Sequence, residues 1–360
     1  MEAWLREHGG ATFAPLRALG LKDRYEPRDA VVLRLGLASA VTFHDPVDLA
    51  AIGEALLAAA PALTELRAFG AVANLVDSPV LPRLRRLSLY AAHPVVALAA
   101  SPAAAGLRGL RIRTGPKAAR VLASSPHLAG LEELDLGFAK LGDDGVRTLV
   151  GPDSRLSALR RLDLLGCGLG PAAGVAFGAS RLPLEVLGLR SNRLGDDGVR
   201  GLTGGDHRWK ELELSGNGVS PEALEALLRS PTASQLASLT LQGNPLGDGG
   251  AAALADHLPP TARHLDLGRC DLTCPGLVRV SSSPRLAGLH GFWLMDTPVD
   301  ATAAAAIGAL PGAQRLSLYG CGLDDDAVGA LVSADGPAWR CGTDSTPSGG
   351  CSSRTARGLS

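Results

Sequence analysis

The sequence has no excess of charge of one sign, no basic leader and no long apolar segment. Its 360 residues include 35 Lys and Arg and 36 Asp and Glu. This balance gives no general attraction to nucleic acid or to an anionic membrane. The N-terminus, MEAWLREHGG, does not place a basic segment before an apolar run, and no run approaches the roughly 18 residues of a membrane-spanning helix. We therefore expect a cytoplasmic protein without a secretory signal.

Lysine is scarce, and the common catalytic motifs are missing. Only 4 of the 35 basic residues are lysine, which together with abundant Ala and Gly indicates a GC-rich bacterial genome. The sequence contains no G-x-S-x-G, H-E-x-x-H or G-x-x-x-x-G-K-[ST] motif, and nothing pairs a nucleophile with a base. We therefore expect no enzyme activity and no cofactor.

The cysteine pattern does not indicate disulfides. A long chain without a signal is expected to keep its thiols reduced, because disulfide frameworks belong mostly to small secreted domains. The sequence gives no role to the last two cysteines. The six cysteines are Cys167, Cys270, Cys274, Cys321, Cys341 and Cys351.

What the sequence has instead is an internal repeat, L-x-x-L-x-L, which occurs eleven times if degenerate copies are included. A small polar or thiol residue follows the last apolar position of many copies by three residues. The copies begin at Leu63, Leu84, Leu107, Leu131, Leu159, Leu184, Trp209, Leu236, Ala262, Leu289 and Ala313. The recurring polar or thiol residues are Cys167, Asn192, Asn217, Asn244, Cys270 and Cys321.

Each repeat predicts one coil made of a strand, a turn and a helix. The alternation in L-x-L points the leucines into one layer and the intervening residues outward. The Asn or Cys is expected to turn inward and satisfy backbone groups of neighbouring coils. Residues 143–150 and 221–230 have the apolar spacing of an amphipathic helix. Because no coil can bury its apolar layer alone, the coils are expected to stack.

This pattern resembles the leucine-rich repeat, and units of mostly 23 to 28 residues with a helical second half resemble its ribonuclease-inhibitor type. The resemblance covers about residues 59–333. It implies an α/β solenoid of horseshoe shape, with parallel strands on the concave face, helices on the convex face and about eleven repeats.

The two ends of the chain are expected to differ from the array. Residues 1–58 are expected to form an N-terminal cap, with one or two strands in 31–43 and a helix in 47–61. The start of the sequence is also similar to the N-terminal part of bacterial leucine-rich-repeat proteins that carry a repeat-companion domain. Residues 334–360 are rich in Ser, Thr and Gly and are predicted to be disordered. The last strand is then covered by this tail, covered by another subunit, or left without a cap.

Two features could be mistaken for chemical sites. The pairs Asp143/Asp144 and Asp196/Asp197 and the triple at 324–326 are adjacent, whereas a calcium loop alternates its ligands. We interpret them as helix starts, in which the first Asp caps the helix, the second lies at the positive end of the dipole and the preceding Gly makes the turn. Residues 166–174, GCGLGPAAG, match a dinucleotide-binding fingerprint, but their glycines occupy the turn positions of the repeat.

Cys270 and Cys274, with His264 nearby, could suggest a zinc site. No second pair at similar spacing is present, and Cys270 already occupies the inward position of its repeat. We therefore predict no metal site.

Function is expected to lie in the outward residues of the strands, which do not repeat. Arginines lie early, carboxylates in the middle, and an aromatic and methionine cluster late. Outward aromatic residues are common anchors of protein interfaces, although Trp293 and Tyr319 could instead pack on each other or under the tail. The predicted partner-binding residues are Tyr90, Arg111, Arg113, Asp135, Arg161, Asp163, Glu211, Glu213, Trp293, Met295, Arg315 and Tyr319.

The sequence thus predicts a non-enzymatic scaffold that binds a protein, and neither nucleic acid nor membrane. A small-molecule ligand is disfavoured because packed coils leave no deep pocket. The alternative is a regulatory accessory of a GTPase or other enzyme, by resemblance to Ran GTPase-activating leucine-rich-repeat proteins. Those proteins tend to carry an acidic tail, which this sequence lacks.

Overall fold

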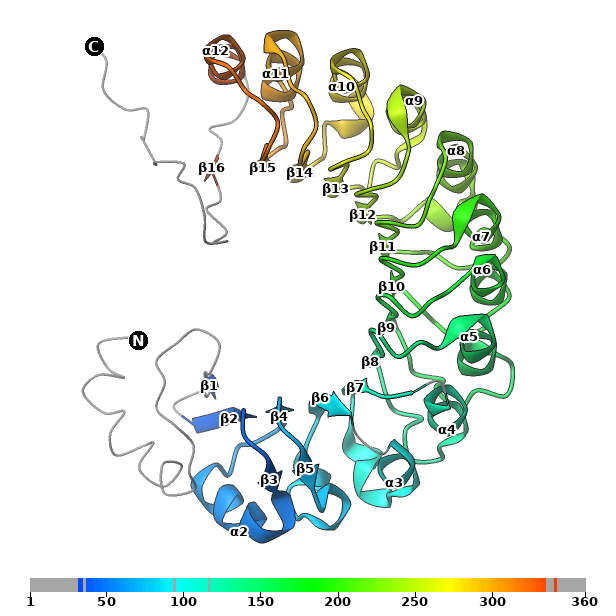
Figure 1. The fold of residues 1–360 in the computed structure, drawn as a ribbon, viewed down its shortest axis with the longest axis vertical. Coiled ribbons are helices and arrows are strands. Elements are labelled where there is room, and N and C mark those ends of the chain that lie inside the picture. Colours follow the sequence, from blue (N-terminus) through cyan, green and yellow to red (C-terminus); the bar gives the residue numbers. More distant parts are fainter. Residues whose placement is uncertain (1–31, 35–36, 93–94, 116, 335–339, 342–360) are drawn as a thin grey trace, which may run out of the picture. The chain divides into compact units, whose positions relative to one another are not determined.

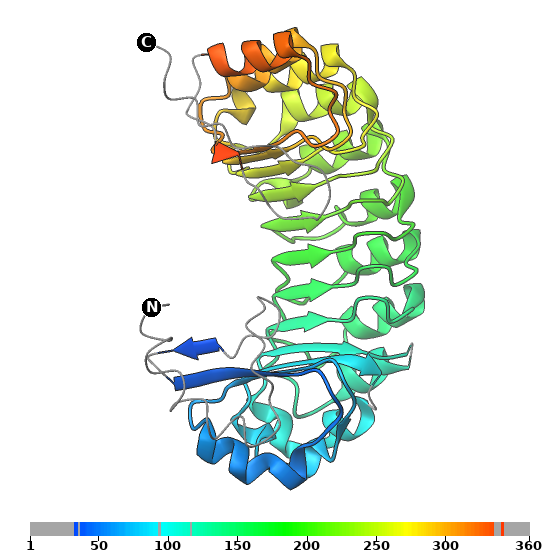
Figure 2. The ribbon, with the colours of Figure 1, turned by 60° about the vertical axis from the view of Figure 1, so that its left-hand side comes forward.

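The computed structural model describes residues 32–34, 37–92, 95–115, 117–334 and 340–341, and the chain forms two compact units, residues 1–193 and 194–360. Within each unit the strands lie side by side and the helices cover one side of them (Figure 1, Figure 2). In each of the eleven predicted L-x-L segments the first apolar residue lies in a strand, and in most of them the strand ends one residue before the second. The fold is therefore the predicted α/β solenoid of stacked coils.

In the N-terminal unit, β1 is antiparallel to β2, and the later strands of that sheet are parallel and follow one another in chain order. β3 and β5 form a separate parallel pair. The elements are β1 (Val32–Arg34), β2 (Leu37–Phe43), β3 (Val47–Asp48), α2 (Leu49–Ala59), β4 (Glu65–Ala68), β5 (Val72–Ala73), η1 (Leu75–Asp77), η2 (Leu81–Arg83), β6 (Arg86–Ala92), α3 (Val95–Ala100), η3 (Pro102–Gly106), β7 (Gly109–Arg113), α4 (Ala118–Ser124), β8 (Glu133–Asp135), α5 (Gly142–Val150), β9 (Arg161–Asp163), α6 (Pro171–Gly178) and β10 (Val186–Gly188).

In the C-terminal unit, the strands from β11 onward are parallel and again follow chain order. The elements are α7 (Gly195–Gly201), β11 (Glu211–Glu213), α8 (Pro221–Arg229), η4 (Pro231–Ala233), β12 (Ser238–Thr240), α9 (Gly247–His257), β13 (His264–Asp266), α10 (Cys274–Ser281), η5 (Pro284–Leu286), β14 (Gly291–Trp293), α11 (Ala301–Gly308), β15 (Arg315–Ser317), α12 (Asp325–Ser333) and β16 (Arg340–Cys341).

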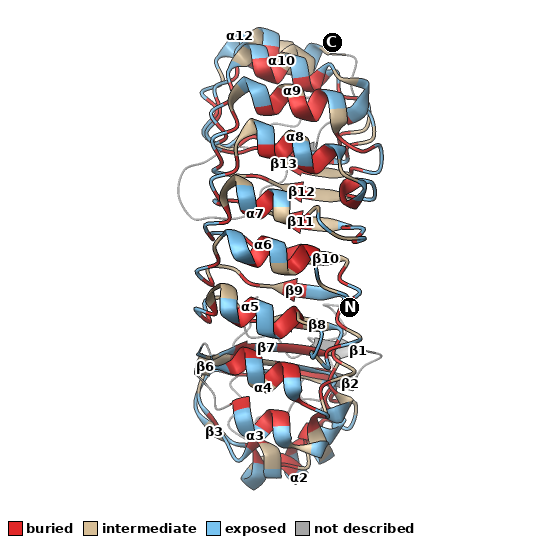
Figure 3. Cartoon of the chain, turned by 90° about the vertical axis from the view of Figure 1, so that its right-hand side faces the viewer, coloured by how far each residue is buried: buried red, intermediate tan, exposed pale blue. Residues whose placement is uncertain are grey.

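The core of each unit lies between the strands and the helices. The leucines of the repeat are buried, and the helices turn a buried side inward and an exposed side outward (Figure 3). Burial weakens at the last described coil, where Leu316 and Leu318 are only half-buried and Val328 and Val332 of α12 are exposed.

The inward Asn and Cys side chains join neighbouring coils, as the repeat predicts. Asn244 donates from Nδ2 to the carbonyls of Leu214 and Leu241, and its Oδ1 accepts from the amide of Val219 at 3.0 Å. The thiol of Cys270 donates to the carbonyl of Leu241 at 3.2 Å. Asn192 and Cys167 make the equivalent contacts in the N-terminal unit. These side chains supply partners for turn backbone groups that are buried away from water.

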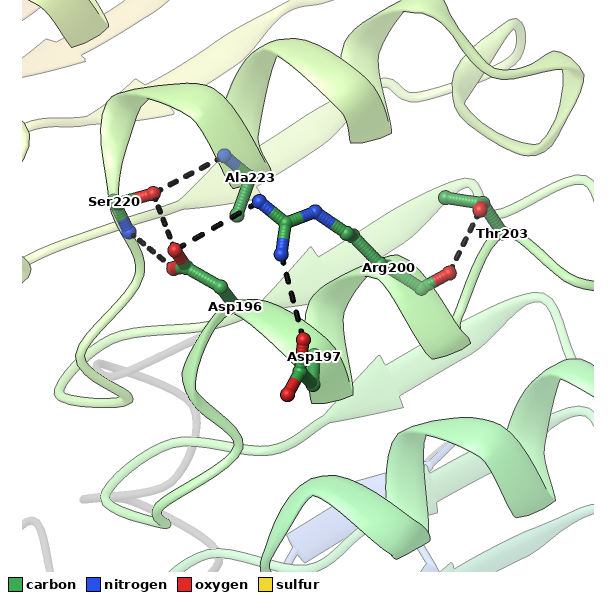
Figure 4. Close-up of polar contacts among 6 residues, drawn as sticks. All are labelled: Asp196, Asp197, Arg200, Thr203, Ser220 and Ala223. Carbon is green, nitrogen blue, oxygen red and sulfur yellow. Dashed lines mark hydrogen bonds and ion pairs between the residues drawn. The ribbon is translucent and has the colours of Figure 1, made fainter.

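The aspartate pairs work differently from the prediction that the first Asp caps its own helix. Asp196 accepts from the amide of Ser220 at 2.9 Å and from its hydroxyl at 2.8 Å, and Ser220 is the N-cap of the next helix, α8 (Figure 4). Asp143 binds the amide of Gly170, and Asp248 binds that of Thr273, again the N-caps of the following helices.

The capping prediction was therefore wrong for Asp143 and Asp196, and the reason is the glycine before each of them. α5, α7 and α9 begin at glycines with φ of 60°, 56° and 51°, and the N-cap residue before each glycine is a leucine. Each Asp thus lies inside the first turn, from which it reaches the next coil. The prediction was right for Asp324, which caps α12 by accepting from the amide of Ala327 at 2.8 Å.

The chain ends extend the sheet. The strands and the helix expected in 31–43 and 47–61 are β1, β2 and α2, and β2 pairs with β4 in parallel. Most of the segment 334–360 lies outside the described residues, as do Cys351 and the side chain of Cys341. Arg340 and Cys341 form β16 beside β15, where the sequence predicts no strand.

Replacing Asp196 by Ala is expected to lower the free energy of unfolding by about 1–2 kcal/mol, because it leaves the N-cap amide and hydroxyl of Ser220 without their carboxylate. Replacing Asp197, whose side chain is 85% exposed and, among the described residues, contacts only Arg200 at 3.4 Å, is the matched control, with an expected change within about 0.5 kcal/mol. Urea denaturation of both variants checks this. Equal losses in the free energy of unfolding of the two variants would show that the hydrogen bonds from Ser220 to Asp196 contribute nothing to stability.

Burial raises the pKa of the Cys270 thiol to about 12, from an ordinary value of 9.0. The thiol of the unfolded chain loses its proton at a lower pH than the buried thiol does. The stability that the buried thiol contributes is therefore intact below pH 9 and falls as the pH rises toward 12. We expect the stability difference between the wild type and Cys270→Ala to shrink above pH 9 in urea denaturation. Iodoacetamide at pH 8 should modify half-buried Cys274 before Cys270, and the reverse order would contradict the buried placement.

Candidate protein-binding face

The strand register places the outward residues in rows that cross each unit. Glu65, Arg86, Gly109, Glu133 and Arg161 are neighbours in the N-terminal unit, and the residues two positions later form the next row. In the C-terminal unit the equivalent rows run from Glu211 to Arg315 and from Glu213 to Ser317. The predicted outward residues are therefore neighbours in space within each unit, on the strand side opposite the core.

Ion pairs hold several early arginines against this face. Arg86 lies 2.9 Å from Glu133, two strands away, and Arg111 pairs with Asp135 of the next strand. The side chains in both pairs are partly exposed, so each pair contributes little to stability. Their effect is to orient the guanidinium groups along the face.

A stack of aromatic rings runs beside these pairs. The ring of Phe69 lies between those of His44 and Tyr90, with centroid distances of 4.8 Å and 4.2 Å and nearly parallel planes. Arg111 donates to the Tyr90 hydroxyl at 2.8 Å and has its guanidinium carbon 5.5 Å from the Tyr90 ring centroid. Of these residues, sequence analysis selected Tyr90 and Arg111 as partner-binding.

Phe138 is a functional candidate that sequence reasoning missed. It has φ of 64°, is 54% exposed, and lies under the guanidinium of Arg113, whose central carbon is 5.4 Å from the ring centroid. The equivalent positions of the next repeats hold Gly166 and Ser191. A bulky residue where the repeat uses small ones was the signal in the sequence.

The central carboxylates are partly engaged by their own backbone. Asp135 accepts from the amide of Gly137 and Asp163 from that of Leu165, both at 2.9 Å. Burial raises the pKa of Asp163, and the charge of Asp135 adds to this. Arg161 is exposed, whereas Glu211 and Glu213 in the C-terminal unit are half-buried.

The late aromatic residues do not form one cluster. Trp293 is half-buried, leans over Gly291 of its own strand and meets the ring of His264 at 5.9 Å, with planes 38° apart. Burial lowers the pKa of His264, and the charges of His290 and Arg315 act in the same direction. Trp293 therefore lies beside a ring that favours its neutral form.

Met295 and Tyr319 contact different groups. Gln242 Nε2 lies 3.4 Å from the sulfur of Met295, and the methionine packs against Gly268. Tyr319 is 63% exposed, and among the described residues no ring contact joins it to Trp293. Arg315 is exposed beside them. Of Trp293, Met295 and Tyr319, Tyr319 is the most exposed.

The features that could be mistaken for chemical sites are occupied by structural contacts. The amide of Gly170, which a phosphate would need at the start of α6, already donates to Asp143 at 2.6 Å. Cys270 is buried, and Cys274 directs its sulfur to the carbonyl of Pro298 at 3.5 Å. No group of three or more His, Cys, Asp and Glu that could hold a metal is found among the described residues. None of the helices in the described ranges has the length and apolar character needed to cross a membrane.

Replacing Gly291 by Ala is expected to move Trp293 outward, because a Cβ at this position would lie 2.4 Å from the Trp293 ring. The ring is the free end of a side chain, so the stability loss should stay near 1 kcal/mol or less. Acrylamide quenching of tryptophan fluorescence should rise, relative to the same measurement in a Trp293→Phe background. Gly115→Ala, which meets no atom within 4 Å, is the control. Unchanged quenching would contradict the packing of the Trp293 ring over Gly291.

Comparison with known proteins supports the repeat. The family described as "Leucine Rich repeat" matches residues 130–150, 183–202, 210–228 and 236–255, and each segment holds one strand and all or most of one helix. No curated protein matches the chain.

Two solved structures are similar to the chain at low identity. An internalin (inlF) from Listeria monocytogenes is 16% identical over 76% of this chain and 80% of its own, with a TM-score of 0.43. The structure of the Rad7 and Elc1 complex in yeast is 14% identical over 71% of this chain and 74% of its own, with a TM-score of 0.46. From the matched segments and the coil geometry together, the chain contains leucine-rich repeats and has the fold of a leucine-rich-repeat solenoid.

Proposed function

We propose that the chain is a non-enzymatic scaffold that binds a protein partner on the outward face of its strands. Leucine-rich-repeat proteins generally act in protein–protein interaction, and this fold is typically a binding scaffold rather than an enzyme. The observation that carries the proposal is the surface made by Trp293, Met295 and Tyr319 in the C-terminal unit. Tyr319 is 63% exposed and Trp293, on the neighbouring strand, is half-buried, so both leave apolar area in water that a partner would cover.

Charged groups around this surface would set specificity. Arg315 belongs to the row of β15 and is exposed, and Glu211 and Glu213 lie on β11 of the same unit. Such groups affect association rate and partner choice more than affinity. The predicted residues of the N-terminal unit, Tyr90 and those around Arg111, would form a second contact area. We also propose the ribonuclease-inhibitor type for the repeats, on the basis of their length and helical second halves.

Replacing Trp293, Met295 and Tyr319 together by Ala is expected to abolish capture of the partner, because interface energy concentrates in such anchors. The measurement is affinity capture from an extract of the source organism, with quantitative mass spectrometry on wild type and variant. A matched control replaces exposed Val96, Val175 and Val332 of the helices by Ala. A partner captured by the wild type and equally by the triple variant would contradict the proposed surface.

The alternative function, an accessory of a GTPase, rests on the family resemblance alone. It requires a change in the rate of GTP hydrolysis when this chain is added to its GTPase. The proteins identified by capture supply the candidates for that assay.

A further inference from the structure

We infer that a strip in the N-terminal unit binds an acidic peptide segment that also carries apolar side chains. The strip, called here the ladder, consists of His44, Phe69, Tyr90, Arg113 and Phe138. This inference rests on the proposed function, protein binding by the strand face, and adds the chemical class of the partner. It concerns a surface separate from the one formed by Trp293, Met295 and Tyr319.

The ladder follows the carboxyl ends of neighbouring strands. His44 and Phe69 come directly after β2 and β4, Tyr90 lies in β6, Arg113 ends β7, and Phe138 follows β8. These five strands are adjacent in the sheet. At about 4.8 Å per strand the ladder is about 19 Å long, which matches about six residues of an extended peptide.

Both faces of the Phe69 ring and one face of the Phe138 ring are covered, whereas both rings remain partly exposed. Phe69 has His44 on one side and Tyr90 on the other, yet it remains 43% exposed. Phe138 has Arg113 over its ring and the Gly166 backbone beside it, where an added Cβ would come within 2.9 Å of the ring. A partner therefore meets mainly the hydrogen-bearing edges of these rings, which carry partial positive charge.

Uncompensated cations lie along the same strip. Arg67, Arg86 and Arg111 each pair with a carboxylate of the face. In contrast, Arg113 is exposed and has no carboxylate partner among the described residues, its recorded contact being the Phe138 ring.

Lys140, in the turn after β8, and Arg190, after β10, are also exposed and have no carboxylate contact within the described ranges. The acid next to His44, Asp45, already interacts with other groups. The strip thus combines positive charge with apolar surface, which is complementary to carboxylates interspersed with apolar side chains.

The covered ring faces favour a peptide over single-stranded nucleic acid. Binding of single strands relies on bases that stack on open aromatic faces. In the ladder, the faces of Phe69 stack on neighbouring rings, and a guanidinium lies over Phe138. Peptide side chains need no stacking face and can lie against ring edges while their carboxylates approach Arg113.

The test is fluorescence anisotropy of the full chain with a labelled peptide of about ten residues, in which Glu alternates with Leu and Phe. We expect saturable binding that weakens as salt is raised, and at least about tenfold weaker binding for Arg113→Glu and for Phe69→Ala. Arg120→Glu on α4 and Val96→Ala on α3 change similar exposed side chains on the helices and should bind as the wild type does. Circular dichroism and urea denaturation establish that each variant folds. If Phe69→Ala does not fold, Phe69→Leu, which keeps the apolar volume, is measured in its place.

Three other probes decide the class of ligand. A peptide with Lys in place of Glu should not bind, a peptide of Glu alone should bind more weakly, and an oligothymidylate of similar length should not compete. Absence of binding by the Glu, Leu and Phe peptide, or equal binding of the Lys peptide, would overturn the inference. Tighter binding of the oligothymidylate would make the ladder a nucleic-acid surface instead.

The outcomes also separate this inference from the proposed function. If capture of a partner depends on Trp293, Met295 and Tyr319 but no acidic peptide binds the ladder, only the further inference fails. If the peptide binds through Arg113 and Phe69 while capture of a partner is unchanged in the Trp293, Met295 and Tyr319 variant, the proposed surface in the C-terminal unit fails.

Discussion

The buried hydrogen bonds at the turn after each strand are the constraint on which the rest of the array depends. A strand of three residues ends abruptly, and several buried amides and carbonyls of the turn that follows it are paired with side chains. Asn192, Asn217 and Asn244 supply both a donor and an acceptor there, and the cysteines supply a thiol. Because each of these groups would be costly to leave unpaired, the turn can take one geometry only. That geometry fixes the register of the next strand, and with it the position of every outward residue.

Local pattern was enough to predict the layers and the inward Asn and Cys contacts, whereas the links that the aspartates make to the next coil were not predictable. The alternation around Leu239 and Leu265 assigns inward and outward sides by itself, and the inward role of Cys270 follows from its place in the repeat. The destination of the Asp196 carboxylate depends on the positive φ of Gly195, which moves the aspartate into the first helical turn. The spacing of residues in the sequence does not predict this backbone conformation at Gly195.

The same distinction applies to the candidate site. Sequence periodicity identified Tyr90 and Trp293 as outward, but their surroundings depend on side chains one coil away. Trp293 leans over a glycine and toward His264 instead of joining Tyr319, and Tyr90 completes a stack that begins at His44. On the outward face of the strands, many side chains already contact one another through ion pairs or lie over a glycine. The residues that can still bind a partner are those that these contacts leave exposed, such as Phe69, Phe138 and Tyr319.

The aspartate links occur in every second coil, from α5 to α6, from α7 to α8 and from α9 to α10. In each case a coil whose helix starts at Leu-Gly-Asp precedes one whose helix has proline in its first turn. Neither kind of coil can be exchanged for the other without losing an acceptor or a donor. From α5 to α10, coils can be inserted or removed without breaking one of these links only as whole pairs, so the unit that preserves the contacts is twice the structural repeat.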